Sequence, residues 1–311
     1  GMCEVSNHDN DIMTSACFHK LYHQPQPFYL QNRTVDESFL VGNVRDPAKR
    51  TLSRLWFTNF EDYRSQPDDE EVIEKILTDS GLKQYGLLSN GRGGFQLWYL
   101  SLSKIEEYSA WSPNATDPNL VIDPGAVERN VEKLLNDYDF LVVAERLDES
   151  LVAMKFLLGV DIHDILYTSS KVAGAGYHYY QSHKVCIELK KFATTDAMTE
   201  FFHSKLWRAL NYGDYLLHEA ASQSLDRTID EQIGRERFEE ELAQFRRELG
   251  LVHEQCSLKG RVVLPCSDNG TVQFEASQSN CYNADVGCGH ACIDEVVEAV
   301  ERNRTNSVHV A

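Results

Sequence analysis

The sequence predicts an α/β protein in which a central parallel sheet is flanked by helices. Two apolar runs, Phe39–Val44 and Phe140–Ala144, have the length and the valine and leucine content of buried strands. Strand-like and helical patterns alternate over residues 39–168, which is typical of parallel sheets covered on both faces. With 311 residues, the chain has room for one or two domains, each with a sizeable core.

The elements of the first half follow from local patterns. Pro47 suits the first turn of a helix that continues to Phe60, and a second helix is expected within residues 64–79. Glycines mark a loop over residues 86–94. The segment 125–138 has the apolar spacing of an amphipathic helix and leads into the second strand.

The second half is expected to be mainly helical. A helix is predicted over residues 149–158, followed by a further strand over Asp164–Tyr167. Residues 195–225 and 227–250 have the patterns of two long helices, and the second of these is heavily charged. A last helix is expected near residues 292–302.

The composition excludes several classes of partner. Thirty basic and 48 acidic residues give a net charge of −18, which argues against a nucleic-acid-binding surface. An acidic chain can still bind an anion, but only through a local cluster of cations. No run of 18 apolar residues occurs, so no membrane span is predicted in this chain.

The cysteines are concentrated near the end of the chain. Five of the eight lie in residues 256–311, which predicts a cysteine-rich, irregular C-terminal extension after a main domain of residues 1–255. Paired C-x2-C spacings are absent and Cys288-Gly-His290-Ala-Cys292 fits known sites poorly, so no metal is expected. Disulfides in an oxidising compartment are the better explanation, with their pairing left open. Four N-x-[ST] sequons also favour the secretory pathway: Asn32, Asn114, Asn269 and Asn303.

A cluster of cations follows the first strand. The segment Arg45–Ser53 reads R-D-P-A-K-R-T-L-S, so Arg45 falls at the carboxyl end of the strand, where open α/β sheets bind ligands. Four cations lie within ten residues: Arg45, Lys49, Arg50 and Arg54. An arginine fork with a nearby hydroxyl, here that of Ser53, suits a phosphate monoester. The alternative is an ordinary helix start with solvated arginines.

A strand, then R-D-P, then a serine eight residues after the arginine resembles the 3′-phosphate-binding motif of sulfotransferases that use 3′-phosphoadenosine 5′-phosphosulfate (PAPS). The block F-L-V-V-A-E-R-L-D-E-S-L-V-A-M-K, Phe140–Lys155, is similar to the galactose-3-O-sulfotransferases, which include the cerebroside-sulfating members. Asp164–Tyr167 follows at a similar distance, and residues 202–215 match more loosely. The resemblance covers residues 15–258 and implies the P-loop-NTPase-like sulfotransferase fold.

The resemblance implies transfer of a sulfuryl group from PAPS to a sugar hydroxyl, a galactose-like 3-OH, of a glycolipid or glycan. Arg45, Ser53 and Arg50 would bind PAPS. Polar side chains of the glycine loop, Asn90 and Gln96, would contact the sugar; a plain surface loop is the alternative.

The general base is also implied by the resemblance. The segment Ala16–His23 is similar to the C-H-H-M-R-F-H segment of the family and places His19 in the role of base. Imidazole suits the task, because it titrates near neutral pH and a sugar hydroxyl is a poor nucleophile. His23 and Glu145 are the other candidates, and a plain loop histidine is the alternative for His19.

One part of the family pattern is absent. The Lys-Thr-rich loop for the 5′-phosphosulfate should lie tens of residues before His19, where this chain has only 18 residues. Ser89–Gly94 is rich in glycine but lacks a preceding strand and a following Lys-[ST]. We therefore expect a piece of a longer protein, with a diverged, non-catalytic relative as the alternative. The resemblance implies a type II membrane protein of the Golgi lumen, with its anchor outside this chain.

Two other functions are alternatives. One is a glycan-binding protein on the same fold that has lost catalysis. The other is a nucleotide kinase, which the absence of G-x-x-x-x-G-K-[ST] disfavours. The sequence leaves the oligomeric state open.

Overall fold

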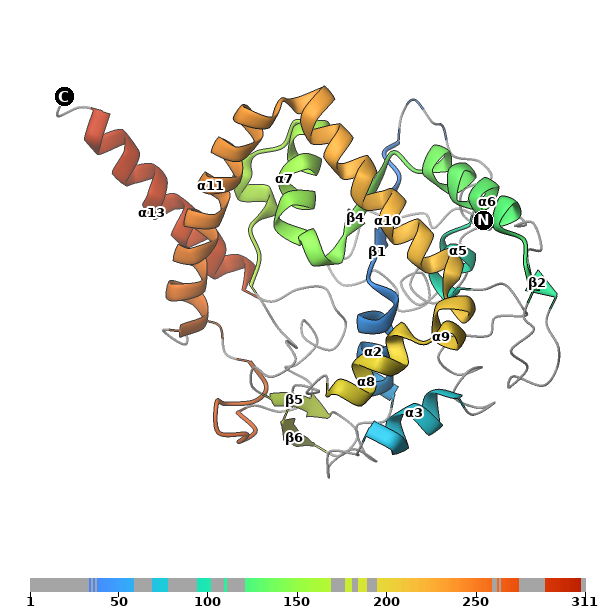
Figure 1. The fold of residues 1–311 in the computed structure, drawn as a ribbon. Helices are drawn as coiled ribbons and strands as arrows, with labels where there is room; N and C mark the ends of the chain where they lie inside the picture. Colours follow the sequence, from blue (N-terminus) through green and yellow to red (C-terminus); the bar gives the residue numbers. More distant parts are fainter. Residues whose placement is uncertain are drawn as a thin grey trace. The chain divides into compact units, whose positions relative to one another are not determined.

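A computed structural model gives the fold, which consists mainly of helices with a few short strands (Figure 1). The structure describes residues 34, 36, 38–58, 69–77, 94–101, 109–110, 121–168, 177–180, 184–188, 195–258, 262, 264–273 and 289–308. The chain divides into two compact units. The first comprises residues 1–50, 72–144 and 200–223, and the second comprises residues 51–71, 145–199 and 224–311.

The first unit contains the parallel strand pair that the sequence predicts. Strand β1 (Val41–Val44) lies beside β4 (Phe140–Val143) in register from Val41 opposite Phe140 to Val44 opposite Val143 (Figure 1). All four side chains of β4 are buried, which explains its continuous apolar run. The Asp139 carboxylate accepts the backbone N–H of Leu40 at 2.6 Å, at the point where both strands begin. This parallel pair is compatible with the predicted α/β class, but within the described residues the parallel sheet has only these two strands and helices predominate.

The helices of this unit begin and end at recognisable signals. In α6 (Pro124–Asp137), proline occupies the first position and the Asp123 carboxylate accepts the backbone N–H groups of Gly125 and Ala126. Helix α5 (Phe95–Leu100) lies beside α6. The buried core of the unit includes Val44, Leu97, Val127, Leu134, Val143, Trp207 and Leu217.

Helix α2 (Pro47–Thr58) begins at the predicted proline and ends two residues before Phe60, and α3 (Asp69–Leu77) lies within the predicted range 64–79. Strands β2 (Ser109–Ala110) and β3 (Val121–Ile122) pair antiparallel.

The helices expected over residues 195–225 and 227–250 are interrupted. The Ser204 hydroxyl accepts the backbone N–H of Trp207 and caps the start of a new helix. Gly234 has a φ of 92°, a conformation that favours glycine, and it separates two further helical elements. The resulting elements are α8 (Asp196–His203), α9 (Lys205–Leu210), α10 (Tyr212–Arg227), the π-helix η6 (Thr228–Ile233) and α11 (Arg235–Val252).

The strand predicted over Asp164–Tyr167 is wrong. Residues Ile162–Ile165 form a 3-10 helix, η5, instead. The Asp164 carboxylate accepts the backbone N–H of Asp161 at 2.8 Å and stabilises this turn.

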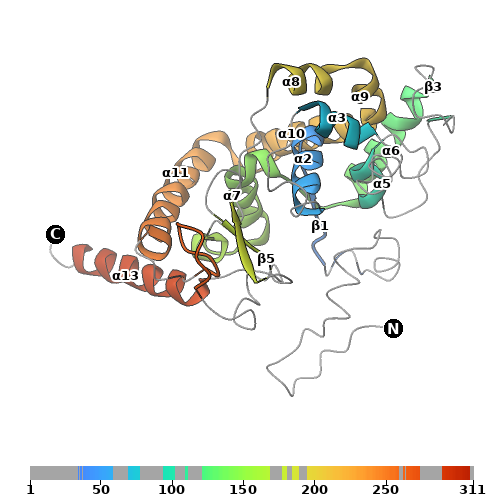
Figure 2. The same cartoon turned by 90° about the horizontal axis from the view of Figure 1, so that it is seen from below.

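The second unit is built on helices that pack along α11. Helix α7 (Leu147–Leu158) lies beside α11 and is joined to it by the ion pair between Lys155 and Glu241, at 2.8 Å. Helix α13 (His290–Val308) also lies beside α11 and contacts the π-helix η7 (His253–Leu258) that continues it (Figure 2). Strands β5 (Tyr177–Tyr180) and β6 (Val185–Glu188) form an antiparallel pair. Among the described residues, no helix has the length and apolar content that crossing a membrane requires.

Two disulfides link parts of the second unit, in agreement with the expectation from the sequence. Cys186 of β6 pairs with Cys266, and Cys256 of η7 pairs with Cys292 of α13. The second disulfide is buried among Val252, Ile293 and Val296. Three of these four cysteines belong to residues 256–311, and the fourth, Cys186, does not.

We expect the Cys256→Ser, Cys292→Ser double variant to lose about 2–4 kcal/mol of unfolding free energy, because the unfolded chain gains freedom when the 36-residue separation is no longer closed. Urea unfolding of the oxidised protein measures the loss. The Cys186→Ser, Cys266→Ser variant should lose at least as much, since its bond closes a separation of 80 residues. Equal stability of both double variants and the parent would contradict this.

Candidate functional site

The R-D-P segment joins a strand to a helix, as the sequence predicts. Strands β1 and β4 end at paired residues, Val44 and Val143, so both finish at the same edge of the pair. Arg45 follows β1 directly and is half-buried, and α2 begins two residues later at Pro47. Arg45 therefore lies at the carboxyl end of a parallel strand, the edge at which α/β sheets bind ligands.

Asp46 and Pro47 account for the start of α2. The Asp46 side chain accepts the backbone N–H of Lys49 at 2.9 Å, and its carbonyl accepts that of Arg50 at 2.8 Å. Asp46 thus caps the helix, and proline suits the first helical position because it has no N–H to leave unsatisfied. The motif gives a sharp turn from strand to helix immediately after Arg45.

Gln96 holds the backbone of Arg45. Its side-chain oxygen accepts the Arg45 N–H and its side-chain nitrogen donates to the Arg45 carbonyl, both at 2.8 Å. Gln96 is buried, at 6% relative exposure, and both ends of its amide are engaged in these bonds. The sequence suggests Gln96 as a sugar contact, whereas the geometry makes it a support for Arg45.

Asp214 in turn holds Gln96. This carboxylate is fully buried and accepts the backbone N–H groups of Gln96 at 3.1 Å and Leu97 at 2.9 Å, with a further backbone bond from Phe95. Asp214 therefore caps α5 from α10, which lies 118 positions away in the sequence. The N-terminus of α5 is occupied by a protein carboxylate.

Gly94 provides the room for this cap. A Cβ at position 94 would lie 2.4 Å from Asp214 Oδ1 and 2.9 Å from the backbone nitrogen of Asp214. Glycine is therefore required here by close approach. Gly94 is the last residue of the segment Ser89–Gly94, which the sequence disfavours as a phosphate-binding loop, and its missing side chain leaves room for the cap of α5.

Arg50 of α2 lies beside Phe95, at the N-terminus of α5 that Asp214 caps. Its guanidinium is 4.6 Å from the centroid of the Phe95 ring, a cation–π distance. Burial raises the pKa of Asp214 above its ordinary value, and the Arg50 charge and the backbone N–H groups oppose this shift. The structure thus places Arg50, expected from the sequence to bind PAPS, against Phe95 and near Asp214.

The remaining predicted site residues are Ser53, Glu145, His19 and Asn90. Ser53 lies on α2, where its side chain is exposed. Glu145 belongs to the 3-10 turn η4 (Ala144–Arg146) that follows β4. His19 and Asn90 lie outside the residues that the structure describes.

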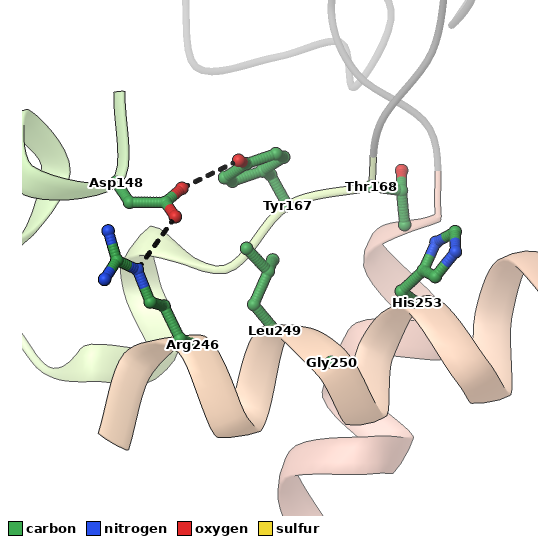
Figure 3. Close-up of a pocket in the computed structure, with 7 residues that line it drawn as sticks. All are labelled: Asp148, Tyr167, Thr168, Arg246, Leu249, Gly250 and His253. Carbon is green, nitrogen blue, oxygen red and sulfur yellow. Dashed lines mark hydrogen bonds and ion pairs between the residues drawn. The ribbon is translucent and has the colours of Figure 1, made fainter. Parts of the chain in front are cut away.

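The second unit contains a pocket that sequence reasoning missed. It has a volume of about 380 Å³ and lies between α7, α11 and the segment after η5 (Figure 3). Its lining residues are Asp148, Tyr167, Thr168, Arg246, Leu249, Gly250 and His253. Asp148 and Tyr167 lie in Phe140–Lys155 and Asp164–Tyr167, the two segments that the sequence interpretation likens to sulfotransferases, and this likeness was the signal that could have pointed to the pocket.

The Asp148 carboxylate is held from two sides (Figure 3). The Tyr167 hydroxyl donates to its Oδ1 at 3.1 Å, and Arg246 Nε donates to its Oδ2 at 3.4 Å. Burial, and then the charge and hydrogen bond of Asp148, raise the pKa of Tyr167 to about 12. The phenol therefore keeps its proton at neutral pH and remains a donor to Asp148.

Within the described ranges, no three His, Cys, Asp or Glu side chains gather in a way that could bind a metal ion. Comparison with known proteins yields no match to any family model, curated protein or solved structure.

Proposed function

We propose that this chain belongs to a PAPS-dependent carbohydrate sulfotransferase, which transfers a sulfuryl group to a galactose-like 3-OH of a glycolipid or glycan. The observation that carries the proposal is the position of Arg45 at the carboxyl end of β1, immediately before α2. This is the strand–turn–helix setting in which the R-D-P motif would present a guanidinium to a phosphate.

The buried support of Arg45 favours the same role. Gln96 fixes the Arg45 backbone, and Asp214 fixes the helix that carries Gln96. When the backbone of an arginine is already fixed, its guanidinium loses less conformational freedom on binding a phosphate in bidentate geometry. Gln96 and Asp214 act in this proposal as positioning residues and do not contact the nucleotide.

In the proposed reaction, the acceptor oxygen attacks sulfur and forms a new S–O bond. The bond between sulfur and the bridging oxygen of the 5′-phosphate breaks, which releases adenosine 3′,5′-bisphosphate. The hydroxyl proton passes to the base, for which we propose His19. Arg45, with Ser53 as the hydroxyl donor that the resemblance adds, would bind the 3′-phosphate at the far end of the nucleotide.

The Golgi lumen is the proposed location. Two disulfides in the second unit suit an oxidising compartment, because thiols of cytosolic proteins are kept reduced. The four glycosylation sequons agree with a secretory route.

We expect Arg45→Ala to weaken binding of adenosine 3′,5′-bisphosphate by about 30- to 150-fold, because a bidentate charge-assisted contact contributes ~2–3 kcal/mol. Isothermal calorimetry measures the affinity. Adenosine 5′-monophosphate lacks the 3′-phosphate, so the same substitution should leave its affinity nearly unchanged.

Arg54→Ala is the matched control, since Arg54 is an exposed cation of α2 in the same cluster. It should change the affinity only slightly, as expected for a screened surface charge. Equal losses in the Arg45 and Arg54 variants would mean that only net charge matters. Unchanged affinity of the Arg45 variant would remove the basis of the proposal.

A further inference from the structure

The pocket of the second unit contains a glycine that packing does not explain. Gly250 lies within α11, where glycine lowers helix stability relative to alanine. Its φ is not in the left-handed region, and a Cβ built on it would meet no atom within 4 Å. A side chain would therefore fit at position 250, which is exposed and lines the pocket.

The helix also changes its winding beside this pocket. After Val252, α11 continues as the π-helix η7, and His253 is its first residue. π-Turns are rare and occur frequently at functional sites. In Figure 3, His253 and Thr168 lie at one end of the pocket and the Asp148–Arg246 pair lies at the other, with Leu249 between them.

The lining chemistry suits a neutral ligand with hydroxyl groups. Asp148 and Arg246 neutralise each other, so the pocket offers no strong excess of either charge. The Asp148 carboxylate has two further lone-pair positions beyond the bonds from Tyr167 and Arg246, and the guanidinium bonds Asp148 through Nε alone. Leu249 and the Tyr167 ring add apolar surface, which can pack on the C–H groups of a sugar ring.

We propose that this pocket binds a neutral sugar residue of a glycan, with Asp148 and Arg246 bonding its hydroxyl groups and Leu249 packing on its ring. The inference rests on the proposed function only for the choice of galactosides as probes. Gly250, the π-turn and the lining residues support the pocket independently of Arg45.

Saturation-transfer NMR with lactose tests the proposal on the whole chain. Gly250→Phe should lower lactose affinity at least tenfold, because it adds a ring at a position that lines the pocket and has open space for a Cβ. Leu251→Phe is the matched control: it adds a ring at the next position of α11, which is exposed and does not line the pocket. This control should bind lactose as the parent does.

Two further variants separate folding from binding. Gly250→Ala should raise Tm by about 2 °C, because alanine favours the helix, while occupying little of the pocket. Asp148→Asn keeps the side-chain shape but loses the charge, and should weaken lactose binding about tenfold. Retained circular dichroism spectra would show that a loss of binding is not a loss of fold.

The outcomes distinguish this proposal from the proposed function. Lactose binding that survives Gly250→Phe, or the absence of saturable binding to lactose, overturns the pocket assignment. Preference for glucuronate over lactose overturns the neutral-sugar assignment. If lactose binds at the pocket while adenosine 3′,5′-bisphosphate does not bind the chain, the sulfotransferase proposal fails and the sugar site stands.

Discussion

Asp214→Ala should destabilise the folded chain by about 3–5 kcal/mol, since it removes the buried acceptor of the α5 backbone N–H groups and a charge near Arg50. Each N–H left without an acceptor in the core loses the bond it could have made to water in the unfolded chain. Urea unfolding at neutral pH measures the change.

Two variants sharpen this test. Asp214→Asn keeps the volume and one acceptor oxygen, so its stability should fall between those of the parent and the alanine variant. Glu128→Ala removes an exposed carboxylate from α6 in the same unit and should leave stability nearly unchanged. Comparable losses in the Glu128 and Asp214 variants would contradict the capping role.

The pH dependence of stability provides an independent check on Asp214. Because the folded pKa lies above the unfolded value of about 3.9, the folded state holds this proton more tightly. The stabilisation from this proton is complete below the unfolded pKa and is lost as the pH rises through the folded pKa. The stability of the parent relative to Asp214→Asn should therefore fall with rising pH across that interval.

His19→Ala should lower sulfate transfer from PAPS to a galactoside by ~10²–10⁴-fold, while the affinity for adenosine 3′,5′-bisphosphate stays nearly intact. The reason is that the proposed base contacts the acceptor hydroxyl, whereas Arg45 contacts the nucleotide. Turnover of the parent should rise with pH through about 6.5, because only neutral imidazole accepts a proton. Transfer of labelled sulfate to a broad panel of glycans measures both.

His23→Ala is the control for His19, and should reduce turnover much less. A His19 variant that retains most of its transfer would exclude this histidine as the base and make Glu145 the next residue to replace. A parent protein that binds glycans but transfers sulfate to none of them would favour the glycan-binding alternative.

Elements with strong local signals could be predicted from the sequence. The strands β1 and β4 and the helices α6 and α7 occur where apolar runs and caps indicated them, with ends that differ by at most two residues. The prediction for Asp164–Tyr167 was wrong because a similar short apolar run forms η5 once Asp164 bonds the Asp161 N–H.

The setting of Arg45 was predictable because the strand, the turn and the helix are adjacent in the chain. Its support was not, because Asp214 reaches Gln96 across 118 positions and the sequence carries no sign of that contact. The pairing of Cys186 with Cys266 could not be predicted from local sequence either, because it joins residues 80 positions apart.

The amide of Gln96 has a consequence for how sequences of this fold can diverge. It must donate at one end and accept at the other, so glutamate at position 96 would direct an oxygen at the Arg45 carbonyl and repel it. Position 94 can gain a side chain only where residue 214 is smaller or lies farther from it. Homologues should therefore keep an amide side chain at position 96 and change positions 94 and 214 together, and aligned sequences would reveal these two as a covarying pair.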